Sequence, residues 1–278
     1  MIPPIADNFV AGETAPEAID RALELDERGV STILNLLGEH YERPEPAAED
    51  RDAYVRLIED LDDAGVEACV SVKPSQLGLD LGKSTFRSNL ETVVETAAER
   101  DAFVWIDMEN HETTDATLDA FEALATTHEW TVGVCLQANL KRTRKDLARL
   151  IDVPGKFRLV KGAYDEPEDI SYTRKARVNE EYRELLRYAL ANRERGIAVG
   201  SHDPAMIEHA GALAAEHGAD FEIQMLMGVR EPAQFDLAAD YDVYQYVPYG
   251  DRWLSYFYRR VAERRENALF AVRAALGV

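Results

Sequence analysis

Eight short runs of branched and apolar residues, separated by amphipathic stretches, are the feature that most restricts how this chain can fold. Nearly uninterrupted apolar strands that alternate with helices indicate a parallel sheet that is buried on both faces. The intervening stretches, such as residues 84–100 and 204–217, carry apolar residues at helical spacing. The predicted strands are residues 31–37, 68–74, 103–109, 130–137, 157–164, 197–203, 221–228 and 243–247.

This number of strands is what a (β/α)8 barrel requires. A further helix precedes the first strand: Thr14 is its expected N-cap, Pro16 and Glu17 lie in its first turn, and it runs to about Gly29. A doubly wound open sheet is the rival architecture, but such a sheet usually binds a nucleotide at a glycine-rich first turn, and none follows residue 37. We therefore predict an α/β fold in which residues 1–278 form one TIM-type barrel domain.

Polar residues follow the predicted strands at the same end of each unit. The carboxyl ends of parallel barrel strands converge on one mouth, where barrel enzymes place their chemistry, so we expect these side chains to face a common site. A purely structural barrel gives no reason for this distribution. The residues are Glu39, Lys73, Asp107, Glu109, Gln137, Lys161, Tyr164, His202, Asp203 and the segment from Gln224 to Met227.

Several chemistries are compatible with these side chains. Asp107 and Glu109 are a candidate glycosidase pair, although carboxylates at strand ends more often orient hydroxyl groups or cations. His202 and Asp203 would begin a metal site, but no second histidine stands at ligand spacing, so we expect no metal. Schiff-base chemistry at Lys161 is the strongest of these three alternatives, because a lysine at the end of a barrel strand forms Schiff bases in aldolases.

The segment after the eighth run predicts a turn at residues 248–250 and then a last helix. Its polar residues are spaced by three and four positions, which places them on one broad face of that helix. Two adjacent arginines there offer planar donor groups suited to a carboxylate or a phosphate. Taken alone, the helix is also compatible with a solvated surface held by one weak ion pair. The four residues on this face are Tyr256, Arg259, Arg260 and Glu263.

Acidic residues far outnumber basic ones. The chain has 52 Asp and Glu residues against 31 Lys and Arg residues, which gives a formal net charge of -21. This charge argues against nucleic acid as a partner and against electrostatic attraction to an anionic membrane. Because 46% of the residues are hydrophobic, the chain is not a disordered acidic polymer. We interpret the acidic excess as the hydrated surface of a halophilic protein.

The expected location is cytoplasmic. The chain has no run of eighteen apolar residues, and its first residues lack the basic head and apolar core of a signal peptide. Cys69 and Cys135 each lie in an apolar strand-like run without C-x-x-C spacing. We therefore expect two buried, reduced thiols in a reducing compartment.

A series of short motifs runs along the chain from about residue 34 to residue 265. The motifs are LNLLGE (34–39), SVKPSQLGL (71–79), DME (107–109), LQANL (136–140), RLVKGAY (158–164), SHD (201–203), QMLMG (224–228), YVPYG (246–250) and YFYRRVAE (256–263). In this order they resemble the proline dehydrogenase family of flavin enzymes. The ordered set with its double arginine is more specific than any single motif. The chain is similar to the short monofunctional form, because it ends where a fused aldehyde dehydrogenase domain would begin.

The resemblance implies a distorted barrel that holds FAD, with the last helix over the barrel mouth instead of in the outer ring. It implies oxidation of L-proline to 1-pyrroline-5-carboxylate by hydride transfer to the flavin, with electrons passed to a quinone-type acceptor. By the same resemblance, the substrate carboxylate is clamped by Arg259 and Arg260, with Lys73 beside them. Leu226 and Tyr256 lie against the substrate ring, and Glu39 is a gate that pairs with the first arginine. Asp107 and Tyr246 are partners in the catalytic site.

The flavin contacts are implied in the same way. Arg158 would lie beside the isoalloxazine, where a fixed cation stabilises the negative charge of the reduced ring. Gly162 and Ala163 suit a flat ring that stacks on a strand end, because larger side chains would block it. The matched cofactor residues are Met108, Gln137, Arg158, Lys161, Gly162, Ala163, Ser201, His202 and Glu263.

Three residues depart from the family pattern. Ser201 stands where the family commonly has threonine, a change that keeps the hydroxyl. Asn35 and Asn179 each stand where the family frequently has aspartate, so the orientation of neighbouring groups is affected more than the chemistry. The family also implies a peripheral membrane contact, although no basic amphipathic helix is present to support one. A Schiff-base aldolase that uses Lys161, and a catalytically inactive barrel that acts as a binding scaffold, are the alternatives from other classes. The sequence sets no oligomeric state.

Salt dependence tests the halophilic interpretation. Because counterions screen the repulsion among surface carboxylates, we expect the unfolding midpoint to rise steadily as KCl is raised into the molar range. Thermal unfolding at a series of KCl concentrations measures this. A midpoint that does not respond to salt would rule the interpretation out.

Overall fold

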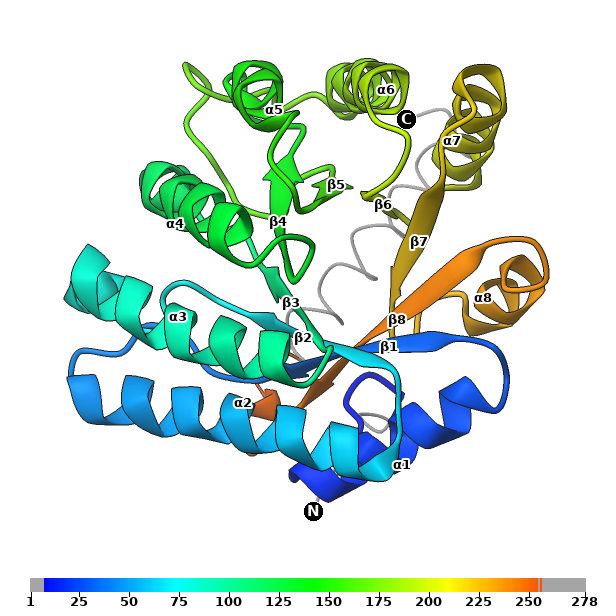
Figure 1. Ribbon diagram of the computed structural model, residues 1–278. Helices are drawn as coiled ribbons and strands as arrows, with labels where there is room; N and C mark the ends of the chain where they lie inside the picture. Colours follow the sequence, from blue (N-terminus) through cyan, green and yellow to red (C-terminus); the bar gives the residue numbers. More distant parts are fainter. Residues whose placement is uncertain (1–7, 255, 257–278) are drawn as a thin grey trace.

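The computed structural model describes residues 8–254 and Tyr256. Within them, eight parallel strands form a closed barrel in sequence order, and β8 pairs with β1 to close it (Figure 1). This confirms the predicted TIM-type barrel. The part of the prediction that concerns the last helix, with Arg259, Arg260 and Glu263, falls outside the described residues.

Each strand coincides with a predicted run, but most of them end before the polar residues, which therefore begin the loops at the barrel mouth. Apolar and β-branched residues fill these strands, as expected where both faces are buried. The strands are β1 (Ser31–Leu36), β2 (Ala68–Val72), β3 (Phe103–Ile106), β4 (Val132–Gln137), β5 (Lys156–Val160), β6 (Ile197–Gly200), β7 (Phe221–Leu226) and β8 (Asp242–Tyr249).

The eighth strand is longer than predicted. A turn was expected at residues 248–250, but β8 continues through Pro248 to Tyr249, paired with β1. The pairing between β7 and β8 ends at Tyr246, so Pro248 lies where its missing N–H has no neighbouring strand to meet. Its carbonyl accepts the N–H of Ala11 at 2.9 Å, and this bond ties the start of the described chain to the barrel mouth.

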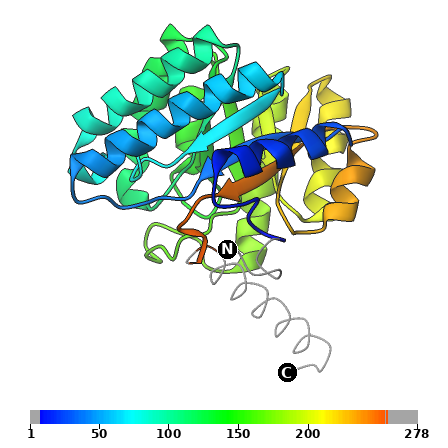
Figure 2. The same cartoon turned by 90° about the horizontal axis from the view of Figure 1, so that it is seen from below.

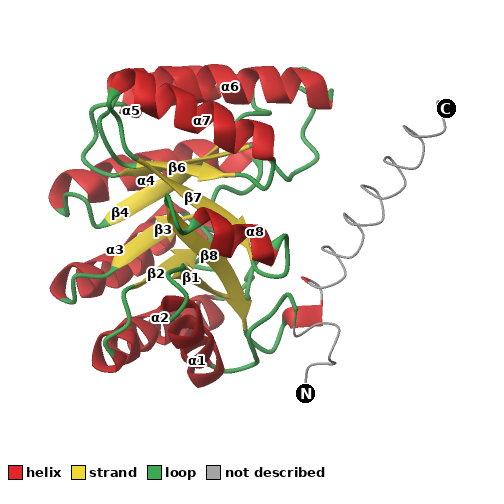
Figure 3. Ribbon diagram, turned by 90° about the vertical axis from the view of Figure 1, so that its right-hand side faces the viewer, coloured by secondary structure: helices red, strands yellow, loops and turns green. Residues whose placement is uncertain are grey.

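Helices surround the barrel on the outside, as Figure 3 shows in red around the yellow strands. Each helix that follows the first strand connects one strand to the next, which is the right-handed arrangement that parallel strands need. The helices after the first strand are α2 (Pro44–Ala64), α3 (Lys83–Glu99), α4 (Thr114–Thr127), α5 (Thr143–Leu150), α6 (Lys175–Asn192), α7 (Pro204–His217) and α8 (Glu231–Leu237), with 3-10 turns η1 (Leu79–Leu81) and η2 (His111–Thr113).

The opening helix, α1 (Ala15–Asp26), completes the outer ring beside β1 and β8 (Figures 1 and 2). Its start is stabilised by Glu17, whose carboxylate accepts the backbone N–H of Thr14 at 2.9 Å. The chain leaves the helix through Gly29, whose φ of 73° favours glycine. In a regular barrel this outer position belongs to the helix that follows the last strand, so the N-terminal segment fills it here.

Among the described helices, none combines the length and the apolar composition that a bilayer crossing demands.

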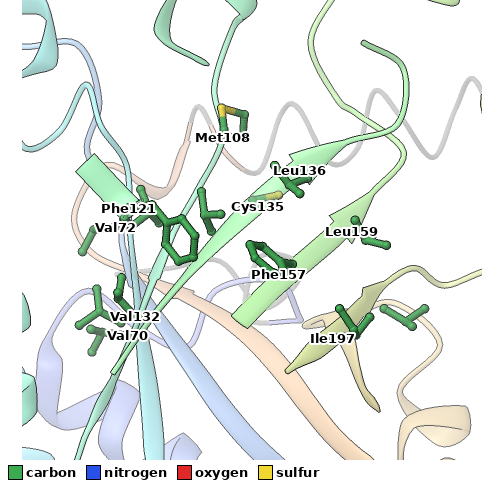
Figure 4. Close-up of a cluster of buried hydrophobic side chains, with 14 of the residues drawn as sticks. Val70, Val72, Met108, Phe121, Val132, Cys135, Leu136, Phe157, Leu159 and Ile197 are labelled. Carbon is green, nitrogen blue, oxygen red and sulfur yellow. The ribbon is translucent and has the colours of Figure 1, made fainter. Parts of the chain in front are cut away.

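The core has two main parts, beside a small third cluster formed by residues 9, 10 and 37. The larger one lies between the outer faces of the strands and the surrounding helices, and Figure 4 shows a section of it. There Phe121 of α4 contacts Phe157 of β5 edge-on, with ring centroids 5.6 Å apart. The smaller part lies inside the barrel and includes Ile33, Cys69 and Trp105. Both cysteines, Cys69 and Cys135, are buried free thiols, as predicted.

Gly133 of β4 makes room for the largest side chain inside the barrel. A Cβ atom at this position would lie 2.6 Å from the Trp105 ring, and Trp105 is fully buried. The indole therefore fits over β4 only because Gly133, its register partner on the neighbouring strand, carries no side chain.

Replacing this glycine tests that packing. We expect Gly133→Ala to lower the stability by about 1–3 kcal/mol, because a buried ring has to move off its rotamer. Gly211→Ala is the control, since Gly211 lies inside α7, where alanine gains about 1 kcal/mol of helix propensity and meets only the Tyr241 hydroxyl at 3.0 Å. Urea unfolding at one fixed salt concentration measures both, and equal losses in the two variants would contradict this account.

Candidate active site

A cavity of about 790 Å³ opens among the residues that follow the strands. All the described site residues that the family resemblance implies line it, so residues of all eight strands or of the loops that follow them meet in one place. These residues are Glu39, Lys73, Asp107, Met108, Gln137, Arg158, Lys161, Gly162, Ala163, Ser201, His202, Leu226, Tyr246 and Tyr256.

Asp107, Arg158 and Tyr246 form a connected group on the inner side of this cavity. The Asp107 carboxylate pairs with the Arg158 guanidinium through Oδ1 and accepts the Tyr246 hydroxyl through Oδ2 at 2.9 Å. The hydroxyl of Ser71 adds a third donor to Asp107 at 2.9 Å. The three predicted catalytic-site residues therefore come together from β3, β5 and β8, and the carboxylate orients the other two.

Burial sets the charge state of this group. It raises the pKa of the Tyr246 phenol well above the ordinary value, and the neighbouring Asp107 charge adds to the effect, so the hydroxyl stays protonated and donates. Burial alone would lower the pKa of the Arg158 guanidinium, but the Asp107 carboxylate together with Cys135 and Tyr246 raises that pKa. The group therefore presents one fixed cation, one carboxylate and one neutral phenol.

Lys73 approaches the cavity from the end of β2. Its ammonium donates to Oδ1 of Asn35 at 3.2 Å, and the other end of that amide donates to the Ser71 carbonyl at 2.7 Å. Asn35 is almost completely buried, so its amide is fixed in this orientation. The side chain that departs from the family pattern thus holds Lys73 without neutralising it, which leaves a positive charge for an anionic group.

The β5 and β6 ends form a second polar area. Lys161 pairs with Asp203 at 2.9 Å, and this hydrogen bond lowers the pKa of the Asp203 carboxyl. Nε2 of His202 accepts the backbone N–H of Leu226 at 2.8 Å, which assigns its proton to Nδ1. Gly162 has a φ of 105°, a conformation that side chains disfavour.

Glu109 does not share the cavity with Asp107. Its buried carboxylate accepts the backbone N–H of Ser75 at 2.7 Å and the Ser75 hydroxyl at 2.6 Å. Burial raises its pKa, although these two bonds counteract that rise. Because Glu109 is engaged in the loop after β2, the pair is not arranged around a common substrate, and the glycosidase alternative is wrong.

No cluster of three or more potential metal ligands occurs among the described residues.

The sequence motifs did not single out every residue of the cavity. Arg252 lines it from the turn after β8, where its guanidinium donates to the Tyr41 hydroxyl at 2.7 Å and lies 4.8 Å from the ring centroid. Tyr41 in turn donates to Asp50 of α2. This contact joins the loop that carries Glu39 to the turn after β8. No periodicity or motif predicts it, because its members are far apart in the sequence.

The comparisons with known proteins agree with this geometry. The family model described as proline dehydrogenase matches residues 18–273. The chain belongs to the proline dehydrogenase family. The family's member from Deinococcus radiodurans is 37% identical over 284 residues, a match that covers 98% of this chain and 90% of the relative. Proline dehydrogenase 2 from Bacillus subtilis is 35% identical, with 96% and 89% covered. The family resemblance of the motifs is confirmed, and the chain is an oxidoreductase.

Solved structures share the fold. Proline utilization A from Bdellovibrio bacteriovorus, inactivated by N-propargylglycine, matches with a TM-score of 0.83 at 23% identity, over 92% of this chain and 32% of the larger one. A variant of proline utilization A from Bradyrhizobium japonicum matches with a TM-score of 0.77 at 24% identity, over 96% and 31%. This chain therefore spans about a third of the length of those structures.

A double-mutant cycle on Asp107 and Arg158 tests how the buried pair contributes to the fold. Either Asp107→Asn or Arg158→Met leaves one buried charge without its counterion, so we expect each to cost about 3–5 kcal/mol of unfolding free energy. The double variant should lose clearly less than the sum of the two, as urea unfolding would show.

The exposed pair Arg100–Asp62 provides the control. Asp62→Asn should cost less than about 1 kcal/mol, because solvent screens that pair. Additive losses at Asp107 and Arg158 would show that they do not depend on each other.

Proposed function

We propose that this protein uses FAD to oxidise L-proline to 1-pyrroline-5-carboxylate and then passes the electrons to a quinone-type acceptor. The observation that carries the proposal is the Asp107–Arg158–Tyr246 group, which places a fixed cation and a neutral phenol in the cavity of a chain that belongs to the proline dehydrogenase family. A site that handles a zwitterionic substrate and a cofactor that becomes anionic needs such fixed, desolvated charges.

Several features of the described residues fit a bound flavin. A Cβ atom at Gly162 would lie 2.1 Å from Oδ1 of Asn139, so the strand end has room only for backbone beneath a flat ring. That Asn139 oxygen is buried without a hydrogen-bond partner in the structure, which leaves an acceptor beside the cavity wall. Lys175, the first residue of α6, also lines the cavity and suits a phosphate group at a helix N-terminus.

The substrate in this proposal is held by its carboxylate. Lys73 contributes a cation that the neutral Asn35 amide leaves uncompensated. By family resemblance, Arg259 and Arg260 complete the anion site as the carboxylate clamp, and Glu39 is the gate that pairs with the first of them. Leu226 and Tyr256 line the cavity as apolar walls for the saturated ring. Anchoring the carboxylate in this way fixes the ring orientation before reaction.

The reaction removes a hydride from ring carbon 5 and a proton from the ring nitrogen. The bond between this carbon and the nitrogen thereby becomes the C=N bond of the product. The bound flavin supplies the acceptor for the two electrons. Arg158 stabilises the negative charge that develops on the cofactor side, while Tyr246 stays in place through its bond to Asp107. The quinone-type acceptor, and the peripheral membrane contact that would go with it, follow from the family resemblance alone.

The arrangement of Lys161 does not favour the aldolase alternative. A Schiff base forms from a neutral amine, and lysines that form one are usually placed in apolar surroundings or next to another cation. Lys161 instead pairs with the Asp203 carboxylate at 2.9 Å. The scaffold alternative has no comparable support, because an inactive barrel does not need the buried charges of the cavity.

A visible absorption spectrum of the purified protein in high salt, before and after anaerobic addition of L-proline, tests the proposal directly. We expect a flavin spectrum that bleaches with L-proline and stays unchanged with D-proline as the control. Flavin that fails to bleach would mean that the substrate is wrong. A colourless protein that takes up no added FAD would contradict the cofactor, and borohydride trapping of Lys161 with a carbonyl substrate would then examine the aldolase.

A further inference from the structure

Side chains from β5 and β7 meet inside the barrel although β6 lies between these strands. The register aligns Arg158 with Ala198 and Glu222, and Gly200 with Gln224, so the row from β6 offers only the two smallest residues. A Cβ atom at Gly200 would come within 3.3 Å of the Arg158 side chain. The small residues of β6 therefore leave the space through which β5 and β7 reach each other.

A continuous chain of polar contacts uses this space. Lys156 at the start of β5 pairs with Glu222 at 2.6 Å, and Glu222 accepts a hydrogen bond from Nε2 of Gln224 at 2.7 Å. Oε1 of Gln224 then accepts a hydrogen bond from Arg158 at 3.1 Å. The order of these contacts fixes the Gln224 amide, because a flipped amide would turn its NH2 group toward the guanidinium and its oxygen toward the Glu222 carboxylate.

The guanidinium of Arg158 is consequently held at two places. Nη2 pairs with Asp107 and Nη1 donates to Gln224, while the group lies 5.1 Å from the Trp105 ring centroid and 5.8 Å from that of Tyr246. Without Gln224, Asp107 would be the one oxygen acceptor on the guanidinium, and the weak contact with the Cys135 thiol would not stop it from pivoting. The second contact removes that freedom, and in a buried site an oriented charge is the one that acts on a developing charge.

We propose that Gln224 and Glu222 are positioning residues for Arg158, which hold its guanidinium in the orientation that stabilises the reduced cofactor. The inference rests on the proposed function, since it assigns these residues to the same flavin site. Gln224 lines the cavity, whereas Glu222 acts from deeper in the barrel through Gln224. Lys156 completes the device by compensating the Glu222 charge.

The variant that tests this is Gln224→Met, which keeps the length of the side chain and removes the acceptor for Arg158. Its matched control is Gln245→Met. Gln245 is also buried, lies on the adjacent strand β8 and has a hydrogen-bond network with Gln234 and Arg21, but it does not line the cavity. The two variants therefore remove similar buried amides on opposite faces of the barrel wall.

We expect Gln224→Met to lower the midpoint potential of the bound flavin and to slow its anaerobic reduction by L-proline at least about tenfold, as loss of a hydrogen bond to a charged group can do. The Kd for L-proline should change less than about twofold, because the substrate anchor is untouched. Gln245→Met should alter neither the potential nor the reduction rate, even where both variants lose stability in urea. A Gln224→Met enzyme with the potential and reduction rate of the parent overturns the inference.

A second variant covers the case in which Gln224→Met does not fold. Glu222→Gln is nearly isosteric, but its neutral amide no longer fixes the orientation of Gln224, so we expect a smaller shift of the potential in the same direction. An unchanged potential in this variant also overturns the inference. The parent enzyme separates a failure of the proposed function from a failure of this inference. If the flavin of the parent does not bleach with proline, the proposed function is refuted. If it bleaches, and substitution of residues 222 and 224 does not change this, only the positioning role is refuted.

Discussion

The pairing of β8 with β1 is the contact on which the remaining structure depends. It closes the sheet, so that every described strand has two neighbours and the carboxyl ends form one ring. Without closure, Asp107 after β3 and Tyr246 of β8 would be separated by the four strands from β4 to β7 of a twisted sheet. With it, they lie within hydrogen-bond distance, and a cavity forms among the loops that leave the ring. The site is therefore a product of closure as much as of its own residues.

Closure also creates a problem, because the enclosed volume is small and dry while the site needs charges. A cation buried as deeply as Arg158 is stable only when it is paired and hydrogen-bonded, since an uncompensated charge in this environment costs several kcal/mol. The barrel meets this requirement by placing charged and polar groups in alternation, from Lys156 at the base through Glu222 and Gln224 to Arg158 and Asp107. The small residues of β6 make this alternation geometrically feasible. The small residues of β6 and the paired charges inside the barrel therefore depend on each other.

Much of the fold could be predicted from the sequence because it depends on periodicity. The apolar runs mark the eight strands, and the polar residues at their ends mark the mouth, since both follow from burial on two faces. The end of β8 was not predictable in this way: Pro248 signals a turn locally, and only the departure of β7 makes a strand acceptable there. The motifs identified residues that line the cavity, whereas Arg252 and its contact with Tyr41 depend on tertiary proximity that no local pattern contains. The orientation of Gln224 likewise depends on Arg158 of β5 as well as on Glu222 of its own strand.

The N-terminal origin of the helix beside the barrel seam has a consequence for how the chain folds. Arg21 of α1 contacts Gln245 of β8 across 224 positions of sequence, so the seam joins the two ends of the described chain. A growing chain presents a curved sheet with two unpaired edges until β8 has been made, and unpaired parallel edges invite association with other chains. Loop-closure entropy makes such distant contacts slow to form. We therefore expect the seam to be the last part of the barrel to form, and we expect the strong negative charge of the chain to oppose association of the open intermediates until it does.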